Sequence, residues 1–199
     1  MSKRRYDSEQ AMHVIADQAA ILFAMKGYAG TSIDELARAS GYSKGHIYYY
    51  FKNKENLFLH LALKGMADWA YKWERASANS QTATEKLYKM GEHVMNNYET
   101  PLLKAGQELA ADPNTKPETV QQLYGLAVTP LKAYTDILLL GIANGEFPPL
   151  DVEHYALLLG AWLGGLCSFI KTLPQEQLAH MFRDTITIFL REIQRDPRT

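Results

Sequence analysis

A short segment at residues 43–51, SKGHIYYYF, holds the side chains that are best suited to binding another molecule. At 100° per residue, its large apolar residues Ile47 and Phe51 share one face of a helix. The opposite face is rich in hydrogen-bond donors and suits a nucleic-acid groove, because lysine and tyrosine donate to phosphate and glycine permits close approach. Gly45, His46 and Tyr49 lie on this face, with Tyr48 on its flank and Lys44 in the first turn.

Two helices joined by a tight turn must position this segment. Ser32 and Glu35 form a Ser-x-x-Glu capping box, which predicts that the first helix begins at about residue 33. Gly41 ends that helix in the left-handed conformation, and Ser43 caps a second helix over residues 44–51. The arrangement is a helix-turn-helix. The turn alone does not establish nucleic-acid binding, because many helical proteins contain a short helix, a glycine and another helix.

The residues around the turn resemble the DNA-binding domain of the TetR family of transcriptional regulators. The resemblance covers about the first 60 residues, and the remainder carries no comparable motif. The matching residues are Gly27, Tyr28, Thr31, Ser32, Leu36, Ala37, Gly41, Ser43, Lys44, Gly45, Ile47, Tyr48, Tyr49, Tyr50, Phe51, Asn53, Lys54, Glu55 and Leu57. We expect DNA contacts from Thr31, Ser32, Ser43, Lys44, Gly45, His46, Tyr48, Tyr49 and Lys54.

The resemblance implies an all-α fold with two domains. Residues 1–54 would form a three-helix helix-turn-helix DNA-binding domain, and residues 55–199 a larger helical domain for ligand binding and dimerisation. It also implies a homodimer that binds double-stranded operator DNA and is released by a small-molecule effector. Repression is the commoner role in the family, and activation stays open.

The helices next to the turn follow from caps and apolar stripes. The first helix is predicted over residues 8–26, capped by Asp7 and ended by Gly27; the basic segment before it, residues 2–6, is either a solubilising tail or an arm that touches DNA. Asn53 is predicted to cap a long helix over residues 54–77, whose N-terminus with Lys54 suits a phosphate. The predicted core of the three N-terminal helices is Ile15, Ala19, Phe23, Ile33, Leu36, Ile47 and Phe51.

The rest of the chain also has a helical pattern. Further helices are predicted over residues 85–99, 101–111, 118–144, 151–172 and 174–195. Pro130 should kink or break the helix over residues 118–144, because it removes a backbone donor. Loops are expected at residues 76–83, 112–117 and 145–150, where small polar residues, prolines and glycine gather.

The last two helices are apolar over more than one face, which predicts an intermolecular four-helix bundle between two chains. The alternative is a deeply buried helical hairpin within a monomer. The resemblance favours the dimer. The predicted interface consists of Leu159, Trp162, Leu163, Leu166, Phe182, Ile186 and Phe189.

Large side chains gather between residues 60 and 147, which suits an adaptable apolar cavity as well as an ordinary helical core. In the family resembled, effectors bind in this part of the chain. Glu92, Glu99 and Asp136 do not stand out as counter-ions, so we expect a small, largely apolar, aromatic-bearing effector of low charge. The predicted ligand residues are Trp69, Trp73, Met90, Tyr98, Tyr124 and Tyr134.

Composition narrows the classes of function. The 199-residue chain is 47% hydrophobic and has a net charge of −1, yet residues 1–54 carry eight Lys and Arg against five Asp and Glu. We expect a cytoplasmic protein without a membrane partner, since there is no uncharged apolar run of 18 residues and the single cysteine, Cys167, suits a reducing compartment. Scattered histidines without metal or catalytic spacing predict no enzyme, no metal and no cofactor. A helical protein-interaction module without DNA binding is the alternative.

Overall fold

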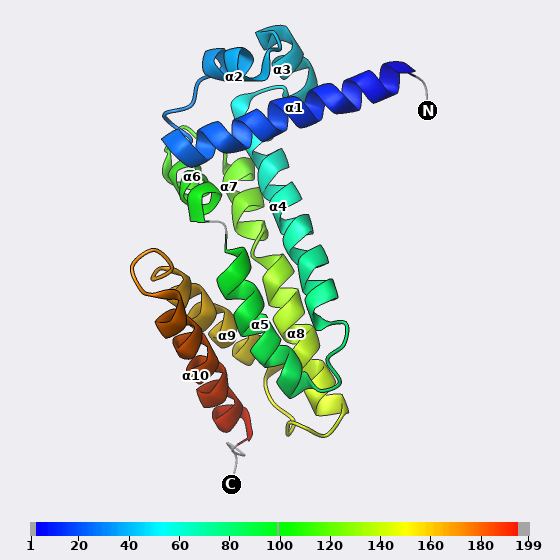
Figure 1. Cartoon of the computed structure of the whole chain (residues 1–199), viewed down its shortest axis with the longest axis vertical. Coiled ribbons are helices and arrows are strands. Elements are labelled where there is room, and N and C mark those ends of the chain that lie inside the picture. Colours follow the sequence, from blue (N-terminus) through cyan, green and yellow to red (C-terminus); the bar gives the residue numbers. More distant parts are fainter. Residues whose placement is uncertain (1–2, 99, 195–199) are drawn as a thin grey trace. The chain divides into compact units, whose positions relative to one another are not determined.

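The computed structural model describes residues 3–98 and 100–194, with residues 3–7, 100 and 101 described by their backbone alone. The described residues are helical and contain no strand, which confirms the predicted all-α class (Figure 1). They fall into two compact units. The first comprises Met1–Ala67 and Glu99–Leu126, and the second comprises Asp68–Tyr98 and Ala127–Thr199. The predicted functional boundary between residues 54 and 55 stays a prediction.

The first unit begins with α1 (Lys3–Lys26), α2 (Ile33–Ser40) and α3 (Lys44–Phe51). The helix α1 starts five residues before the predicted Ser8, so Asp7 is not its cap, and the predicted arm at residues 3–6 is helical; Ser2 lies outside the described residues. The reason is propensity, because the start of the chain contains no glycine or proline and several residues that favour helix.

The predicted caps of α2 and α3 are confirmed. The Ser32 hydroxyl accepts from the Glu35 backbone while the Glu35 carboxylate accepts from the Ser32 backbone, and Gly41 ends α2 with φ 73°. The Ser43 hydroxyl accepts from the His46 backbone N–H and starts α3. These local bonds satisfy amides that a helix start otherwise leaves unpaired.

The remaining helices of the first unit are the start of α4 (Lys54–Ser77), α6 (Thr100–Ala111) and α7 (Pro117–Gly125). Asn53 caps α4 as predicted, since its side-chain oxygen accepts from the Asn56 N–H at 2.7 Å. Six of the seven predicted core residues are buried in this unit, and Ile33 packs against them half-buried. The other large members of this core are Tyr28, Leu57, Phe58, Leu61 and Leu109.

The predicted break near Pro130 is confirmed, and it falls four residues earlier in the chain. The helix α7 ends at Gly125, and α8 (Val128–Ala143) begins just before Pro130. The proline ring would clash with the carbonyl of the residue four before it, Leu126, so the helix cannot continue through that point. Pro117–Ala143 is long and apolar enough to cross a membrane, with a mean hydropathy of 1.4 in its most apolar window. Within α8, Ile137 and Leu138 are buried, and 28% of the most apolar window is buried.

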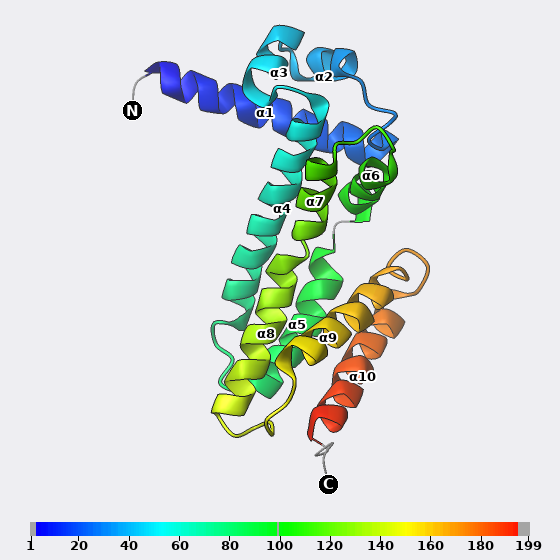
Figure 2. The same ribbon diagram turned by 180° about the vertical axis from the view of Figure 1, so that it is seen from behind.

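The second unit packs α5 (Ala83–Asn97) and α8 against α9 (Val152–Cys167) and α10 (Gln175–Gln194). The last two form a hairpin, side by side in both views (Figures 1 and 2). The helix α9 ends at Cys167, five residues before the predicted Thr172. There the Ser168 and Thr172 hydroxyls donate to the carbonyls of Gly165 and Phe169, in a run of single turns.

Glu146, in the loop between α8 and α9, caps α5 from a distance. Its two carboxylate oxygens accept the backbone N–H groups of Ala83 at 2.7 Å and Thr84 at 3.0 Å. Burial raises the pKa of Glu146, but the hydrogen bonds from Ala83 and Thr84 outweigh it, so the pKa lies below its usual value. A lowered pKa in the folded state means that the ionised cap stabilises the fold above the unfolded pKa of about 4.3.

We therefore expect Glu146→Gln to lower the free energy of unfolding by about 1 kcal/mol at neutral pH, the typical value of a helix cap. The difference from the natural protein should shrink as the pH falls below about 4, where Glu146 itself takes up a proton. Chemical denaturation at several pH values measures this. Glu153→Gln, in the exposed first turn of α9, is the control. An equal loss in both variants, or a loss independent of pH, would contradict the assignment.

Candidate nucleic-acid interface

The loop that enters the helix-turn-helix is held from α6. Gly27 has φ 75°, which favours glycine, and the next backbone N–H, of Tyr28, donates to the Glu108 carboxylate at 3.0 Å. A side chain at residue 27 would collide with that carboxylate. Gly27 is therefore favoured by its backbone angle, and a side chain there would also displace the Glu108 carboxylate.

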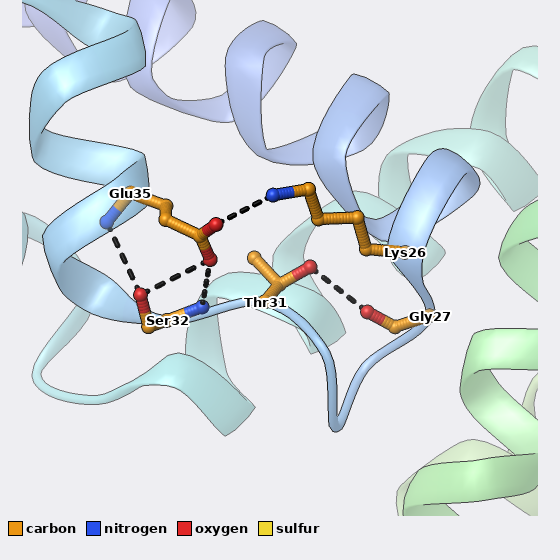
Figure 3. A network of polar contacts seen from close by, with 5 residues as sticks. All are labelled: Lys26, Gly27, Thr31, Ser32 and Glu35. Carbon is orange, nitrogen blue, oxygen red and sulfur yellow. Dashed lines mark hydrogen bonds and ion pairs between the residues drawn. The ribbon is translucent and has the colours of Figure 1, made fainter.

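A polar network closes the same loop on α2 (Figure 3). Lys26 pairs with Glu35 at 2.5 Å, and the Thr31 hydroxyl donates to the Gly27 carbonyl at 2.8 Å. Lys26, together with the Ser32 backbone and hydroxyl, lowers the pKa of Glu35 to about 2. Glu35 thus stays ionised at neutral pH and fixes both the helix start and the end of α1.

The loop residues predicted to contact DNA differ in exposure. Thr31 is 1% exposed, and its hydroxyl and backbone N–H both donate within the chain, to Gly27 and Tyr28. Ser32 is exposed, although its hydroxyl is engaged by Glu35. The structure therefore gives Thr31 a supporting place under the loop, and its contact with DNA stays a prediction.

The outer face of α3 brings the other predicted residues together. Tyr49 is 80% exposed and Tyr48 49% exposed, with Gly45 and His46 exposed beside them. The Ser43 hydroxyl lies 2.7 Å from His46 Nδ1, so Nε2 is the ring nitrogen left for an outside contact. Phenol oxygens and an imidazole on one convex helix can donate to phosphates and to base edges.

No other atom of the chain comes close enough to Gly45 to require a glycine there. A Cβ atom placed there would meet only the Ser43 hydroxyl, at 3.6 Å, which is an ordinary contact. Glycine in a helix is less stable than alanine, because it loses more conformational entropy on folding. At Gly45 the missing side chain leaves room for something outside the chain to come close to the helix.

Lys44 is exposed and pairs with Asp34 across the turn. Pairs between exposed charges contribute little, on the order of 0–1 kcal/mol, so a phosphate can compete with Asp34 for the ammonium group.

Lys54, predicted to contact a phosphate, forms several contacts within the chain. Its Nζ donates to the carbonyls of Tyr28 and Thr31, both at 2.9 Å, and lies 4.2 Å from the centre of the Tyr28 ring. Burial lowers the pKa of Lys54. Two of its three N–H donors are thus used within the chain, and a phosphate contact by Lys54 stays a prediction.

Sequence reasoning missed two residues of this region. Glu108 lies 80 positions after its partner Tyr28, so no local pattern announces the pair. Lys52 is an exposed lysine with φ 65° directly after α3, and its backbone N–H donates to the Tyr48 carbonyl. A non-glycine residue with positive φ is uncommon and tends to occur at functional positions. For Lys52, the only signal in the sequence is that a basic residue directly follows the YYYF run.

The predicted effector residues are divided between the units. In the second unit the Trp69 and Trp73 rings both pack on His93, Met90 is fully buried, and Tyr134 is buried where Gly160 leaves room for it. Tyr98 is half-buried there. Tyr124 belongs to the first unit and is 71% exposed. A groove of about 380 Å³ between α5 and α10 is lined by none of them. Their contact with an effector stays a prediction.

The predicted dimer residues mostly face the chain's own core. Leu159, Leu163, Phe182, Ile186 and Phe189 are each at most 2% exposed, whereas Trp162 and Leu166 are half-buried. The reason is that the most apolar stripe of each helix is used for packing within the chain. The surface left to α9, which we call the outward face of α9, consists of Leu157, Ala161, Gly164, Gly165 and Ser168.

Cys167 is an inert packing residue. It is 1% exposed, its thiol donates to the Leu163 carbonyl at 3.2 Å, and burial raises its pKa to about 12. Among the described residues, no group of three His, Cys, Asp or Glu side chains could hold a metal ion.

Comparison with known proteins agrees with this geometry. The profile of a family described as "Bacterial regulatory proteins, tetR family" matches residues 15–61, and that of "QacR-like protein, C-terminal region" matches residues 65–195. The transcriptional regulator QacR of Staphylococcus aureus is 30% identical over 149 residues, covering 74% of this chain and 79% of QacR. The transcriptional repressor KstR2 of Mycolicibacterium smegmatis is 29% identical over 140 residues, covering 68% and 67%.

Solved structures of regulators share the fold. FadR of Bacillus subtilis, in complex with stearoyl-CoA, has a TM-score of 0.76 at 22% identity, covering 89% of this chain and 97% of that one. The fatty acid degradation regulator FadR of Bacillus halodurans has a TM-score of 0.76 at 20% identity, covering 94% and 96%. These matched proteins are regulators and not enzymes.

The exposed position of Gly45 predicts that alanine there has opposite effects on stability and on DNA binding. Gly45→Ala should raise the free energy of unfolding by about 0.5 kcal/mol, because alanine favours the helix. The same change should weaken binding to a DNA duplex, because the methyl group obstructs close approach. Denaturation and a duplex titration measure the two effects. Gly125→Ala, an equally open glycine at the end of α7, should leave duplex affinity unchanged. Unchanged affinity in Gly45→Ala would contradict the interpretation.

Proposed function

The chain belongs to the TetR family of transcriptional regulators, and from this premise we propose that it is a repressor which binds operator DNA as a homodimer. We further propose that a small, largely apolar effector releases it, and that it acts in the cytoplasm. The observation that carries the proposal is the outer face of α3, where exposed donors surround a glycine without an internal purpose. The name of the relative KstR2 as a repressor supports the direction of control.

On DNA, α3 would enter the major groove with its first turns. The exposed Lys44, Tyr48 and Tyr49 would donate to phosphates, and these contacts fix the position of the helix without reading sequence. His46 Nε2 would reach a base edge, so that His46 contributes to the choice of operator.

The structure supports a positioning role for Lys54. Its Nζ ties the first turn of α4 to the loop before α2, through the carbonyls of Tyr28 and Thr31. The neighbouring Glu55 accepts from the buried Thr119 hydroxyl of α7 at 2.9 Å. The first turn of α4 is therefore bonded on one side to the helix-turn-helix and on the other to α7. A shift of that turn would move the loop that carries α2 and α3.

For the dimer, we propose the outward face of α9 together with the exposed Ile188 of α10. Ile188 and Leu157 are both 54% exposed, and the glycines at 164 and 165 have open space around them. Small residues along a helix allow two backbones to come close, and a twofold contact of this kind suits a homodimer. Two linked recognition helices would then read half-sites about 34–36 Å apart.

The effector is proposed to be small, largely apolar and of low charge, and to bind in the second unit. FadR of Bacillus subtilis was solved with stearoyl-CoA, so a protein of this fold accommodates a ligand with a long apolar part. Here the aromatic residues Trp69, Trp73 and Tyr134 would supply apolar contacts. Release requires the effector to bind the DNA-free conformation more tightly, with a coupling of about 1–3 kcal/mol.

Titration against the intergenic DNA that flanks its own gene tests the proposal. We expect tight binding that falls steeply with salt concentration, because phosphate contacts release counter-ions. The alternative, a helical protein-interaction module, predicts no preference for that DNA over random duplex and no steep dependence on salt.

Substitution of Lys54 distinguishes a positioning role from a direct contact with phosphate. We expect Lys54→Met to lower the free energy of unfolding by about 1–3 kcal/mol, because two carbonyls lose their donor. It should weaken duplex binding while leaving the salt slope unchanged. Lys44→Met is the matched comparison and should reduce the slope by about one. If Lys54→Met instead reduced the slope by one at unchanged stability, Lys54 would be a phosphate ligand.

The outward face of α9 predicts how the dimer can be broken. Leu157→Arg should give a folded monomer, because Leu157 is exposed within one chain and a charge in an apolar contact between chains is costly. The monomer should bind the operator at least tenfold more weakly, since half-sites are no longer linked. Sedimentation and circular dichroism measure assembly and folding. Leu103→Arg, an exposed apolar position on α6, is the control. A Leu157→Arg variant that dimerises normally would place the interface elsewhere.

A further inference from the structure

One buried histidine in the second unit carries a polar atom that the chain does not satisfy. His93, on α5, is 4% exposed, and its Nε2 has no hydrogen-bond partner. Among the described side chains the only other such atom is the Ser80 hydroxyl, in the loop after α4. A buried donor without an acceptor destabilises the folded chain, so it requires an explanation.

The protonation of the ring follows from Asn97, one turn further along α5. Asn97 Nδ2 donates to the His93 carbonyl at 2.9 Å, which fixes the orientation of the amide. The same Nδ2 lies 3.1 Å from His93 Nδ1, so Nδ1 must accept its second hydrogen. In the neutral ring the proton is therefore on Nε2, and the unsatisfied group is an N–H donor.

The surroundings keep this ring neutral. Burial lowers the pKa of His93, the Trp69 backbone acts in the opposite direction, and the Lys72 charge lowers the pKa further. The ring is thus neutral near pH 7, and its N–H faces an environment that disfavours additional positive charge.

Two tryptophans flank the donor. The centre of the Trp69 ring lies 4.6 Å from that of His93, and the centre of the Trp73 ring lies 5.6 Å away. Trp69 is 8% exposed, whereas Trp73, one turn later on α4, is half-buried, so part of its ring is open to solvent. Two indoles around one directional donor resemble the usual composition of a ligand site, which is apolar walls with few placed polar groups.

We propose that His93 Nε2–H is the polar anchor of the effector site and takes the acceptor oxygen of a flat, apolar molecule held against Trp69 and Trp73. This inference rests on the proposed function, and it specifies the class of effector as one bearing a carbonyl or similar acceptor oxygen. A cationic effector is disfavoured, because both the N–H dipole and Lys72 present positive charge.

Two probes of the same shape test the anchor. 2-Acetylnaphthalene carries a carbonyl oxygen where 2-isopropenylnaphthalene carries a CH₂ group, so they differ by one acceptor. Quenching of tryptophan fluorescence gives the affinity of each. The natural protein should bind the ketone about 3–10-fold more tightly, the value of one neutral hydrogen bond. His93→Phe should bind the ketone no more tightly than the alkene, because the carbonyl oxygen then has no donor. The exposed-site variant His154→Phe should keep the preference for the ketone.

Three results would overturn the anchor: a preference that persists in His93→Phe, no preference in the natural protein because a buried water already serves Nε2, or no binding of either probe. His93→Phe removes the unsatisfied donor, and it also removes Nδ1 as the acceptor of Asn97 Nδ2, which keeps only the backbone carbonyl of residue 93. Should it fail to fold, ¹⁵N-resolved NMR of the natural protein decides. The Nε2–H proton should move downfield with the ketone and not with the alkene, and equal shifts would also overturn the proposal.

The same samples separate this inference from the proposed function. Binding to the flanking intergenic duplex is measured for the natural protein and for His93→Phe without any probe. Duplex binding without a ketone preference refutes only the anchor. A ketone preference without duplex binding refutes only the proposed regulator, since the effector site is then attached to a protein of another role.

Discussion

The first unit depends on how Tyr28 is held. Its ring stacks on Phe23 at 5.6 Å and meets the edge of Phe58 at 5.7 Å, while the Lys54 ammonium lies over it at 4.2 Å. Its backbone N–H donates to Glu108, and its carbonyl accepts from Lys54. One residue thus joins α1, α4 and α6 at the point where the chain turns toward α2. Aromatic packing supplies apolar contact here, and the two polar bonds fix the direction of the loop.

The contacts that hold Tyr28 explain why so few bonds are needed within the helix-turn-helix itself. Each of its two helices is only eight residues long, which is too short to be stable alone in water. Their stability comes from Leu36, Ile47 and Phe51, which are buried in the shared core, and from side-chain caps at both starts. The side chains on the outer face of α3 are then not needed for packing the core. Its tyrosines and its glycine can be chosen for an outside partner.

What the sequence could predict follows from the range of the interactions. Helix starts and ends were predictable at Ser32, Gly41 and Ser43, because a cap acts within a few residues. The break before Pro130 was predictable for the same reason. The bonds of Glu108 and Lys54 were not, since their partners lie 80 and 26 positions away. For Leu163 and Phe189, apolarity indicated burial correctly, but it does not specify whether the same chain or a second chain covers a residue.

Most buried polar side chains of the described residues bond within the chain, and His93 of the second unit departs from this pattern. In the first unit the buried Thr31 and Thr119 and the half-buried Lys54 each bond to a partner within the chain, and these bonds specify a single arrangement. In the second unit His93 Nδ1 is satisfied by Asn97 while Nε2 is left unpaired between two indoles. A core built only for stability would place an apolar side chain there, because an unsatisfied donor costs more than a hydrocarbon of similar shape. The cost is offset only when an acceptor arrives from outside the chain.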